Sequence, residues 1–232
     1  MVAYDLTHLT QDADQQVSGP IQDDEALLIY ALIKVMRLRR VLEIGGLSGY
    51  SARNFIAAVG NEGVVYTVDL QELPVQAPNH RIITKDAAYL TAADVDYLPL
   101  DLVFFDCHFL KVQMELLFRL TALSLITSDT VLVLHDTNLH PAKFVYWSRK
   151  VEGGWEHQRV ERQMVDDLRR LGYDAVCFHT DMLRHGPELP FRHGLTIMRK
   201  YRRLGMSGAL GILRHHTAIL AAKYGLRPLS KW

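Results

Sequence analysis

The sequence contains few cysteines, no excess of charge of either sign and no long hydrophobic run. Its two cysteines, Cys107 and Cys177, stand in no paired motif such as C-x-x-C, which argues against a disulfide framework. The 26 acidic residues balance the 26 lysines and arginines, which argues against a protein whose whole surface binds nucleic acid. The apolar stretch at 26–33 is less than half the roughly 20 residues of a membrane span. Because the first 25 residues are polar and acidic rather than signal-like, we expect a cytoplasmic protein.

What the sequence does have is a regular alternation of apolar runs with helical patterns. The apolar runs predict strands at about 40–44, 64–69, 80–84, 101–105, 130–135, 173–178 and 195–199. The helical patterns lie at about 22–38, 49–59, 86–93, 110–125 and 159–171. Such an alternation predicts an α/β fold with a doubly wound, mostly parallel sheet that helices cover on both faces. We divide the chain into an N-terminal arm at 1–21, this sheet domain at 22–200 and a basic tail at 201–232.

A glycine-rich turn follows the first expected strand. The segment VLEIGGLSGYS at 41–51 places three glycines between an apolar run and a helix: Gly45, Gly46 and Gly49. Glycines allow a tight turn that brings backbone N–H groups close to an anion at the helix N-terminus. A dinucleotide-binding G-x-G-x-x-G motif would need glycine where Leu47 stands. The spacing is instead E-x-G-x-x-x-G, beginning at Glu43, and similar turns also occur without any ligand.

An aspartate follows each of four expected strands: Asp69, Asp86, Asp106 and Asp136. A single aspartate at a strand end commonly caps the next helix, and Asp86 is the best example of that alternative. The carboxyl ends of parallel strands meet at one edge of a sheet, where ligands bind. Four aspartates there predict a cleft lined with carboxylates, whose repulsion hydrogen-bond donors or a cation would relieve.

The E-x-G-x-x-x-G spacing, followed by Tyr50, Ser51 and Ala52, resembles motif I of the class I S-adenosylmethionine-dependent methyltransferases. It is most similar to the small O-methyltransferases of the catechol O-methyltransferase type. The resemblance covers about residues 20–200. It implies a Rossmann-like sheet of seven strands whose last strand is antiparallel and lies between strands five and six. It also implies an enzyme that binds S-adenosylmethionine.

The resemblance assigns roles in cofactor binding to several of these residues. Asp69 matches the acid that accepts hydrogen bonds from the ribose hydroxyls, and Asp86 with Ala87 matches the pair that contacts adenine. Gly45 and Ser51 match contacts to the methionine carboxylate. The expected cofactor site is completed by Glu43, Gly46, Gly49 and Asp106.

A metal site is expected where Asp106 and Asp136 end neighbouring strands, because paired carboxylates suit a hard divalent cation. Metal-dependent O-methyltransferases have an Asp-Asn pair at the second position, but here Thr137 replaces the asparagine and Asn138 follows it. The pair His135-Asp136 instead resembles a bacterial branch that includes sugar and macrolide O-methyltransferases. We therefore expect Asp106, Asp136, His135 and Asn138 to bind Mg²⁺ or, second, Mn²⁺ or Fe. An ion-free cleft is the alternative.

Methyl transfer to a hydroxyl requires alignment with the sulfonium and removal of a proton. His108, two residues after Asp106, could accept that proton, or it could only cap a helix or satisfy a buried neighbour. Lys111 is a second candidate base, although a lysine in a helix is more often a solvated charge. The expected strand order places His193 beside His135, or His193 simply ends a strand. We count His108, Asp106, Lys111 and His193 as candidate catalytic residues.

Two further segments bear on partners. An aromatic insertion at 138–159, with Tyr146, Trp147 and Trp155, could close over an acceptor or form a dimer interface. Beyond Met198 stand eight basic and no acidic side chains, so this tail could contact anionic lipid or a lipid-linked acceptor, or pack on its own domain or a second subunit.

The expected function is S-adenosylmethionine-dependent O-methylation of a small molecule, a sugar or a secondary metabolite, by a homo-oligomer that binds no nucleic acid. The alternatives are a binding protein that kept the fold without its chemistry and an enzyme of another reaction class on the same fold.

Overall fold

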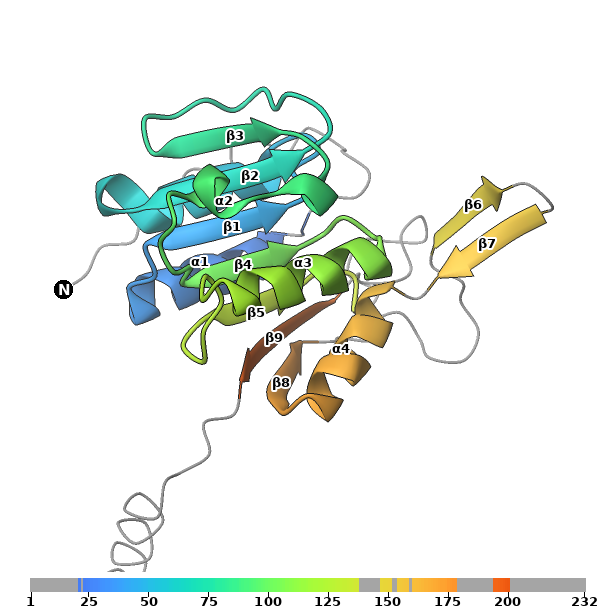
Figure 1. The fold of residues 1–232 in the computed structure, drawn as a ribbon. Coiled ribbons are helices and arrows are strands. Elements are labelled where there is room, and N and C mark those ends of the chain that lie inside the picture. Colours follow the sequence, from blue (N-terminus) through green and yellow to red (C-terminus); the bar gives the residue numbers. More distant parts are fainter. Residues whose placement is uncertain are drawn as a thin grey trace, which may run out of the picture. The chain divides into compact units, whose positions relative to one another are not determined.

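The computed structural model describes residues 21, 23–137, 147–151, 154–158, 160–178 and 194–200. The chain divides into units at 1–200 and 201–232, and all described residues belong to the first (Figure 1). The basic tail lies outside the described residues, as does the expected arm except for Ile21, so their predicted roles stay predictions. None of the described helices combines the length and apolar composition of a membrane span.

Seven strands form the central sheet in the order β3-β2-β1-β4-β5-β9-β8. They are β1 (Arg40–Ile44), β2 (Val64–Asp69), β3 (His80–Thr84), β4 (Leu102–Phe105), β5 (Val131–Leu134), β8 (Tyr173–Phe178) and β9 (Leu195–Lys200). The first five are parallel, and β9 runs antiparallel between β5 and β8. This arrangement confirms the predicted fold, including the antiparallel last strand.

Helices cover the two faces of the sheet because side chains alternate along each strand. On one face, α1 (Asp23–Met36) and α2 (Tyr50–Val59) pack on a core that includes Val41, Phe104 and Val133. On the other, α3 (Leu110–Ala122) and α4 (Val160–Arg170) pack on Leu42 and Phe105. The layers hold β1, β4 and β5 rigidly between them, so the residues that follow these strands start from fixed positions.

Two local predictions needed correction. The helix expected at 86–93 consists of two short 3₁₀ turns, η3 (Ala87–Tyr89) and η4 (Ala92–Val95). Asp86 caps the first turn and Thr91, in a capping box with Asp94, starts the second, so the chain restarts instead of continuing as an α-helix. Within the aromatic insertion, β6 (Trp147–Val151) and β7 (Gly154–Gln158) pair as an antiparallel hairpin that the sequence did not lead us to expect.

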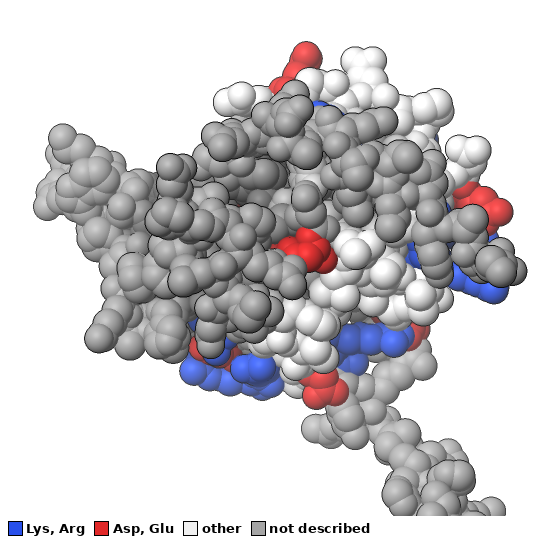
Figure 2. Space-filling model, turned by 180° about the vertical axis from the view of Figure 1, so that it is seen from behind, with Lys and Arg blue, Asp and Glu red and all other residues white. Residues whose placement is uncertain are grey.

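The described surface carries charges of both signs. On the side of the molecule that Figure 2 shows, the described Lys and Arg side chains lie near Asp and Glu side chains. Ion pairs such as Arg39 with Glu62 and Arg199 with Asp129 are largely exposed, and such pairs contribute about 0–1 kcal/mol each to stability. Exposed pairs of this kind therefore contribute little to the stability of the fold.

The turn after β1 requires glycine at position 45. Gly45 has φ +94°, and its N–H donates to the carbonyl of Val68 at 2.9 Å. A Cβ atom at this position would lie 2.5 Å from the carbonyl oxygen of Asp106, which follows β4. The backbone of the turn therefore passes directly against the backbone of the neighbouring strand end.

We predict that Gly45→Ala destabilises the protein more than Gly172→Ala. Gly172 has a similar φ of +85°, but its Cβ would meet nothing within 4 Å, so this variant reports the backbone strain alone, about 1–2 kcal/mol. Gly45→Ala should lose about 1–3 kcal/mol more, because the fixed carbonyl of Asp106 cannot move aside. Urea unfolding of both variants tests this, and equal losses would contradict it.

Candidate active site

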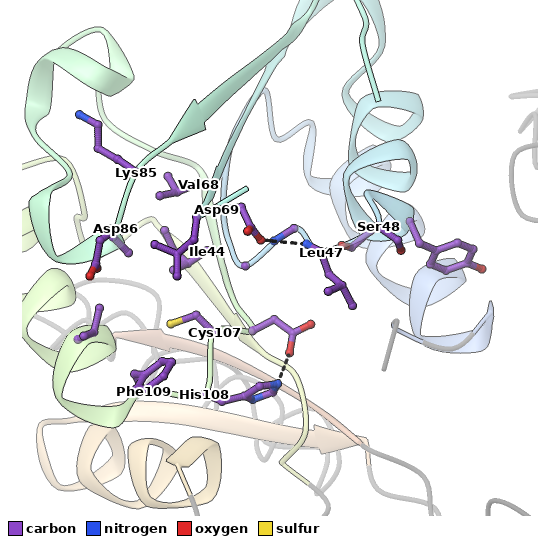
Figure 3. A pocket seen from close by; sticks show the side chains of 18 residues that line it. Ile44, Leu47, Ser48, Val68, Asp69, Lys85, Asp86, Cys107, His108 and Phe109 are labelled. Carbon is purple, nitrogen blue, oxygen red and sulfur yellow. Dashed lines mark hydrogen bonds and ion pairs between the residues drawn. The ribbon is translucent and has the colours of Figure 1, made fainter. Parts of the chain in front are cut away.

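A cavity of about 520 Å³ opens at the carboxyl edge of the sheet, where the predicted cleft was expected. Its walls come from the glycine turn, from the ends of β2 and β3 and from the segment after β4. In Figure 3, Asp69 reaches toward the glycine turn at Leu47, while His108 and Phe109 line the opposite side. Three of the four predicted aspartates line this one cavity: Asp69, Asp86 and Asp106.

Asp69 closes the glycine turn. One carboxylate oxygen accepts the N–H groups of Gly46 at 2.8 Å and Leu47 at 3.0 Å, and the other accepts the N–H of Gln71 at 3.0 Å. A carboxylate can accept about four hydrogen bonds, so a ligand hydroxyl can still be added at the cavity side. The contact with ribose stays a prediction, and the structure adds a role in shaping the turn.

The far end of the cavity is built by the turn after β3. Asp86 accepts the N–H of Ala88 at 2.8 Å, so it acts as the cap that the alternative described, while both Asp86 and Ala87 also line the cavity. Arg119 of α3 donates to the carbonyls of Ala87 and Ala88 at 3.2 and 2.8 Å. These two hydrogen bonds from the guanidinium group fix the backbone of the turn that carries the predicted adenine contacts, Asp86 and Ala87.

Glu43 lies behind the glycine turn rather than in the cavity. Its carboxyl group is fully buried and accepts hydrogen bonds from the hydroxyls of Ser51 and, at 2.7 Å, Thr67. Burial raises the pKa of Glu43 to about 8. Glu43 is thus not among the residues that line the cavity, but it binds Ser51, which is, and its part in cofactor binding stays a prediction.

Asp106, His108 and Asp136 converge at the reactive end of the site. One ligand atom from each lies within 4.8 Å of the others, and this is the group among the described residues that could hold a metal ion. Nε2 of His108 is 3.7 Å from Asp106 Oδ1 and 3.6 Å from Asp136 Oδ2. Two of the expected ligands, Asp106 and Asp136, are thus together, and the third member is His108, one of the two candidate bases.

His135 does not fit the role of a metal ligand that the sequence suggested. Its ring is fully buried, with Nδ1 3.2 Å from Asp106 and Nε2 3.2 Å from Glu25. Burial opposes a charge on the ring, but the charges of Asp106 and Asp136 outweigh it and hold the pKa of His135 well above its usual range. Both nitrogens thus already lie against carboxylates, and the described group that could hold an ion consists of Asp106, His108 and Asp136 without His135.

His108 has a different environment at each nitrogen. Nδ1 is 3.0 Å from Glu161, which also accepts a hydrogen bond from Gln113 Nε2 at 3.2 Å. Burial lowers the pKa of His108, but the hydrogen bond with Glu161 and the charges of Asp106, Glu161 and Asp136 raise it to about 9. Without an ion in the site, His108 is thus an imidazolium at neutral pH.

Glu25 and Glu161 are the site residues that the sequence reasoning missed. In the sequence, Glu25 is one of several acids in the first turn of the helix expected at 22–38, and Glu161 lies in the helix expected at 159–171. Both are almost fully buried, with 5% and 1% of the side chain exposed. The signal that could have found them is helical spacing: Glu25 precedes Ile29 by four residues, and Glu161 precedes Met164 by three, so each acid shares the apolar face of its helix.

Of the three remaining candidates, Lys111, Asn138 and His193, the structure describes Lys111 alone. The side chain of Lys111 is 86% exposed on α3, pairs with Glu115 at 3.9 Å and is absent from the cavity lining. This position agrees with the alternative that Lys111 is a solvated charge. Asn138 and His193 lie outside the described residues. Cys107 lines the cavity, but burial raises the pKa of its thiol to about 12, so it does not supply a thiolate.

Comparison with known proteins places the fold. No protein-family model and no curated protein sequence match the chain. Among solved structures, the O-methyltransferase TomG from Streptomyces achromogenes, involved in tomaymycin synthesis and crystallised with SAM, is 16% identical; the match covers 87% of this chain and 92% of that one, with a TM-score of 0.53.

Two other solved structures agree with this placement. An O-methyltransferase from Bacillus cereus in complex with SAH is 14% identical over 85% of this chain and 92% of that one, with a TM-score of 0.55. The SAH-bound methyltransferase PaMTH1 from Podospora anserina is 14% identical over 85% of this chain and 87% of that one, with a TM-score of 0.52. At these identities the likeness shows the fold alone, and that fold is the one the resemblance predicted.

We predict that Glu43→Gln makes stability less dependent on pH. In wild type the unfolded chain ionises Glu43 above a pKa of 4.5, whereas the folded chain keeps the proton up to about 8. This group therefore lowers the free energy of unfolding by about 1.4 kcal/mol for each pH unit between these two values. Glutamine has no proton to lose, and its side-chain amide can accept a hydrogen bond from the Ser51 hydroxyl and donate one to the Thr67 hydroxyl. The free energy of unfolding of Glu43→Gln should therefore change less with pH than that of wild type.

Urea unfolding between about pH 5 and 8 measures this difference. The exposed Glu62→Gln serves as the matched control and should follow the wild-type curve. Parallel curves for wild type and Glu43→Gln would contradict a neutral buried carboxyl group.

Proposed function

We propose that the protein is an S-adenosylmethionine-dependent O-methyltransferase, assisted by a divalent cation, that acts on a hydroxyl of a sugar or a secondary metabolite. The observation that carries this proposal is a juxtaposition. The glycine turn with Asp69 and the Asp106–His108–Asp136 group lie at one strand edge, and Asp106 and His108 line the same cavity as Asp69. The relatives in fold crystallised with SAM or SAH support it as well.

The lining of the cavity fits the cofactor. A volume of about 520 Å³ is in the range of small-molecule sites, about 300–1,000 Å³. Val68, Ala87 and Phe109 offer apolar surface for an adenine, and Asp69 offers charged acceptors for ribose hydroxyls. Each hydrogen bond to such a charged acceptor contributes about 1.5–3 kcal/mol.

The charges at the reactive end favour a cation. Four carboxylates, from Glu25, Asp106, Asp136 and Glu161, surround two imidazoles. The carboxylates thus outnumber the imidazoles by four to two. A divalent cation would balance this excess of buried carboxylates and would be bound here favourably. Carboxylate oxygens are also the donors that hard divalent cations prefer.

The chain's own residues would then align the reactants. The glycine turn and Asp69 would fix the methyl donor, while Asp106 and Asp136 would hold a cation at the end of the cavity where the acceptor hydroxyl has to lie. A cation bound there would lower the pKa of the acceptor hydroxyl and orient it. Nε2 of His108 faces the same space, so two roles are open to this ring: acceptor of the hydroxyl proton and third ligand of the cation.

We predict that Asp69→Ala weakens binding of S-adenosylhomocysteine by at least about tenfold, because a charged acceptor of ribose and the closure of the glycine turn are lost together. Isothermal titration measures the dissociation constant. Asp129→Asn, which removes an exposed carboxylate paired with Arg199, is the control and should bind as wild type does. Unchanged affinity in Asp69→Ala, or no binding by wild type, would refute the cofactor site.

We predict that Asp136→Asn abolishes product formation while S-adenosylhomocysteine still binds, since Asp136 serves the reactive end and not the cofactor end. Wild type, S-adenosylmethionine and a panel of hydroxyl-bearing sugars and phenols are incubated, and mass spectrometry detects the gain of one CH₂ unit. Chelation by EDTA should have the same effect as the substitution. Methylation that survives both treatments would remove the cation from the proposal, and cofactor binding without any product would favour a binding protein.

A further inference from the structure

The two histidines of the site have separate tasks because their exposure differs. His135 is fully buried and both of its nitrogens face carboxylates, whereas His108 is 31% exposed and lines the cavity. Any ion that enters from the cavity meets His108, and the nitrogen facing Asp106 and Asp136 is Nε2. Its distances to them, 3.7 and 3.6 Å, exceed the usual 2.7–3.2 Å of an N–H···O hydrogen bond.

Glu161 holds the ring of His108 in this orientation. The carboxylate is 1% exposed on α4 and lies 3.0 Å from Nδ1. Gln113 of α3 donates to the same carboxylate oxygen at 3.2 Å, so the acceptor itself is fixed from a second helix. An imidazole whose Nδ1 is bound in this way presents Nε2 as its coordinating nitrogen, the arrangement of carboxylate–histidine–metal triads.

The backbone at the site is also set for this arrangement. His108 and Asp136 have φ values of +57° and +58°, in the left-handed region that residues other than glycine seldom occupy. Such conformations persist only where the surrounding structure imposes them, and among the described residues they also occur in turns away from this group, at Arg37, Asp96, Tyr97 and Ser124. Here they lie at two of the three residues whose ligand atoms are within 4.8 Å of one another. When one metal ion lies between two opposite ligand atoms, those atoms are about 4.2 Å apart, because each metal–ligand bond is about 2.1 Å long. The ligand atoms of the three residues are therefore spaced closely enough to share one ion.

We propose that Nε2 of His108 is the third ligand of the cation held by Asp106 and Asp136, that Glu161 is the residue that positions it, and that this set selects Mn²⁺, Fe²⁺ or Co²⁺ over Mg²⁺. An imidazole nitrogen suits transition metals, whereas Mg²⁺ prefers oxygen ligands. This inference rests on the cation of the proposed function and gives it a chemical identity. The hydroxyl proton then leaves to a group other than His108.

Metal binding tests this without any methyl acceptor. Wild type and variants are titrated calorimetrically with MnCl₂ and MgCl₂, and the visible absorption of added Co²⁺ reports its ligands. Wild type should bind Mn²⁺ more tightly than Mg²⁺. His108→Ala should weaken Mn²⁺ binding by about 10- to 100-fold, change Mg²⁺ binding much less and alter the Co²⁺ spectrum.

The positioning role has its own variant. Glu161→Gln should weaken Mn²⁺ binding by about 10- to 100-fold, the usual effect of removing the partner of a ligating histidine. It should have no further effect once His108 is alanine, because it acts through that ring. Glu115→Gln, an exposed glutamate on α3, is the control and should bind Mn²⁺ as wild type does.

The outcomes separate the inference from the proposed function. Wild-type Mn²⁺ affinity in His108→Ala, or equal wild-type affinities for Mn²⁺ and Mg²⁺, would overturn the inference, provided that Asp136→Asn still removes binding. If wild type binds no ion, the cation of the proposed function falls with it, and titration of the same samples with S-adenosylhomocysteine still reports on the cofactor site. If Glu161→Gln does not fold, Mn²⁺ binding by His108→Ala still tests whether His108 is a ligand, because the side chain of His108 is partly exposed.

Discussion

Two carboxylate–imidazole pairs join the helix layers to the sheet where β4 and β5 end. Glu25, on one face of the sheet, binds His135, and Glu161, on the other face, lies against His108. Both imidazoles face Asp106, so the two layers meet through charge at a single carboxylate. Ion pairs this deeply buried add little net stability, because desolvation offsets their attraction. Their value lies in geometry: removal of one partner leaves an uncompensated buried charge, so the arrangement tolerates few alternatives.

The cofactor end depends on a neutral group instead. Glu43 is buried behind the glycine turn among the hydroxyls of Ser51 and Thr67, and Thr67 continues to His80 at 2.9 Å. Burial is the largest influence on the pKa of Glu43, and no positive charge is among the groups that lower it. The carboxyl group therefore keeps its proton. One buried acid is thus neutral and supports the turn, while Asp106, at the other end of the site, faces two imidazoles. The difference in partners separates a structural end from a reactive end within one strand edge.

The sequence was sufficient for the fold and for the acids that follow strands, and insufficient for the groups that reach the site from helices. Asp69, Asp86 and Asp106 could be placed together because parallel strands end at one edge. Glu25 and Glu161 come from helices on opposite faces, and their convergence depends on packing that local spacing does not encode. The role of His135 was misjudged for the same reason: Glu25, distant in sequence, occupies the nitrogen that a metal would need. The hairpin of β6 and β7 was missed because its strands are largely polar.

Burial explains why two histidines beside the same carboxylate are not equivalent. A ring with no exposed surface, held between Asp106 and Glu25, has both nitrogens against carboxylates that hold its pKa well above the usual range, so it acts as a fixed positive charge. A ring that is 31% exposed can release the proton at the nitrogen that faces the cavity when a cation arrives, because the cation supplies the positive charge that the proton supplied before. The buried histidine therefore stays a fixed partner of the carboxylates, and the partly exposed histidine is the ring that an ion entering the cavity can reach.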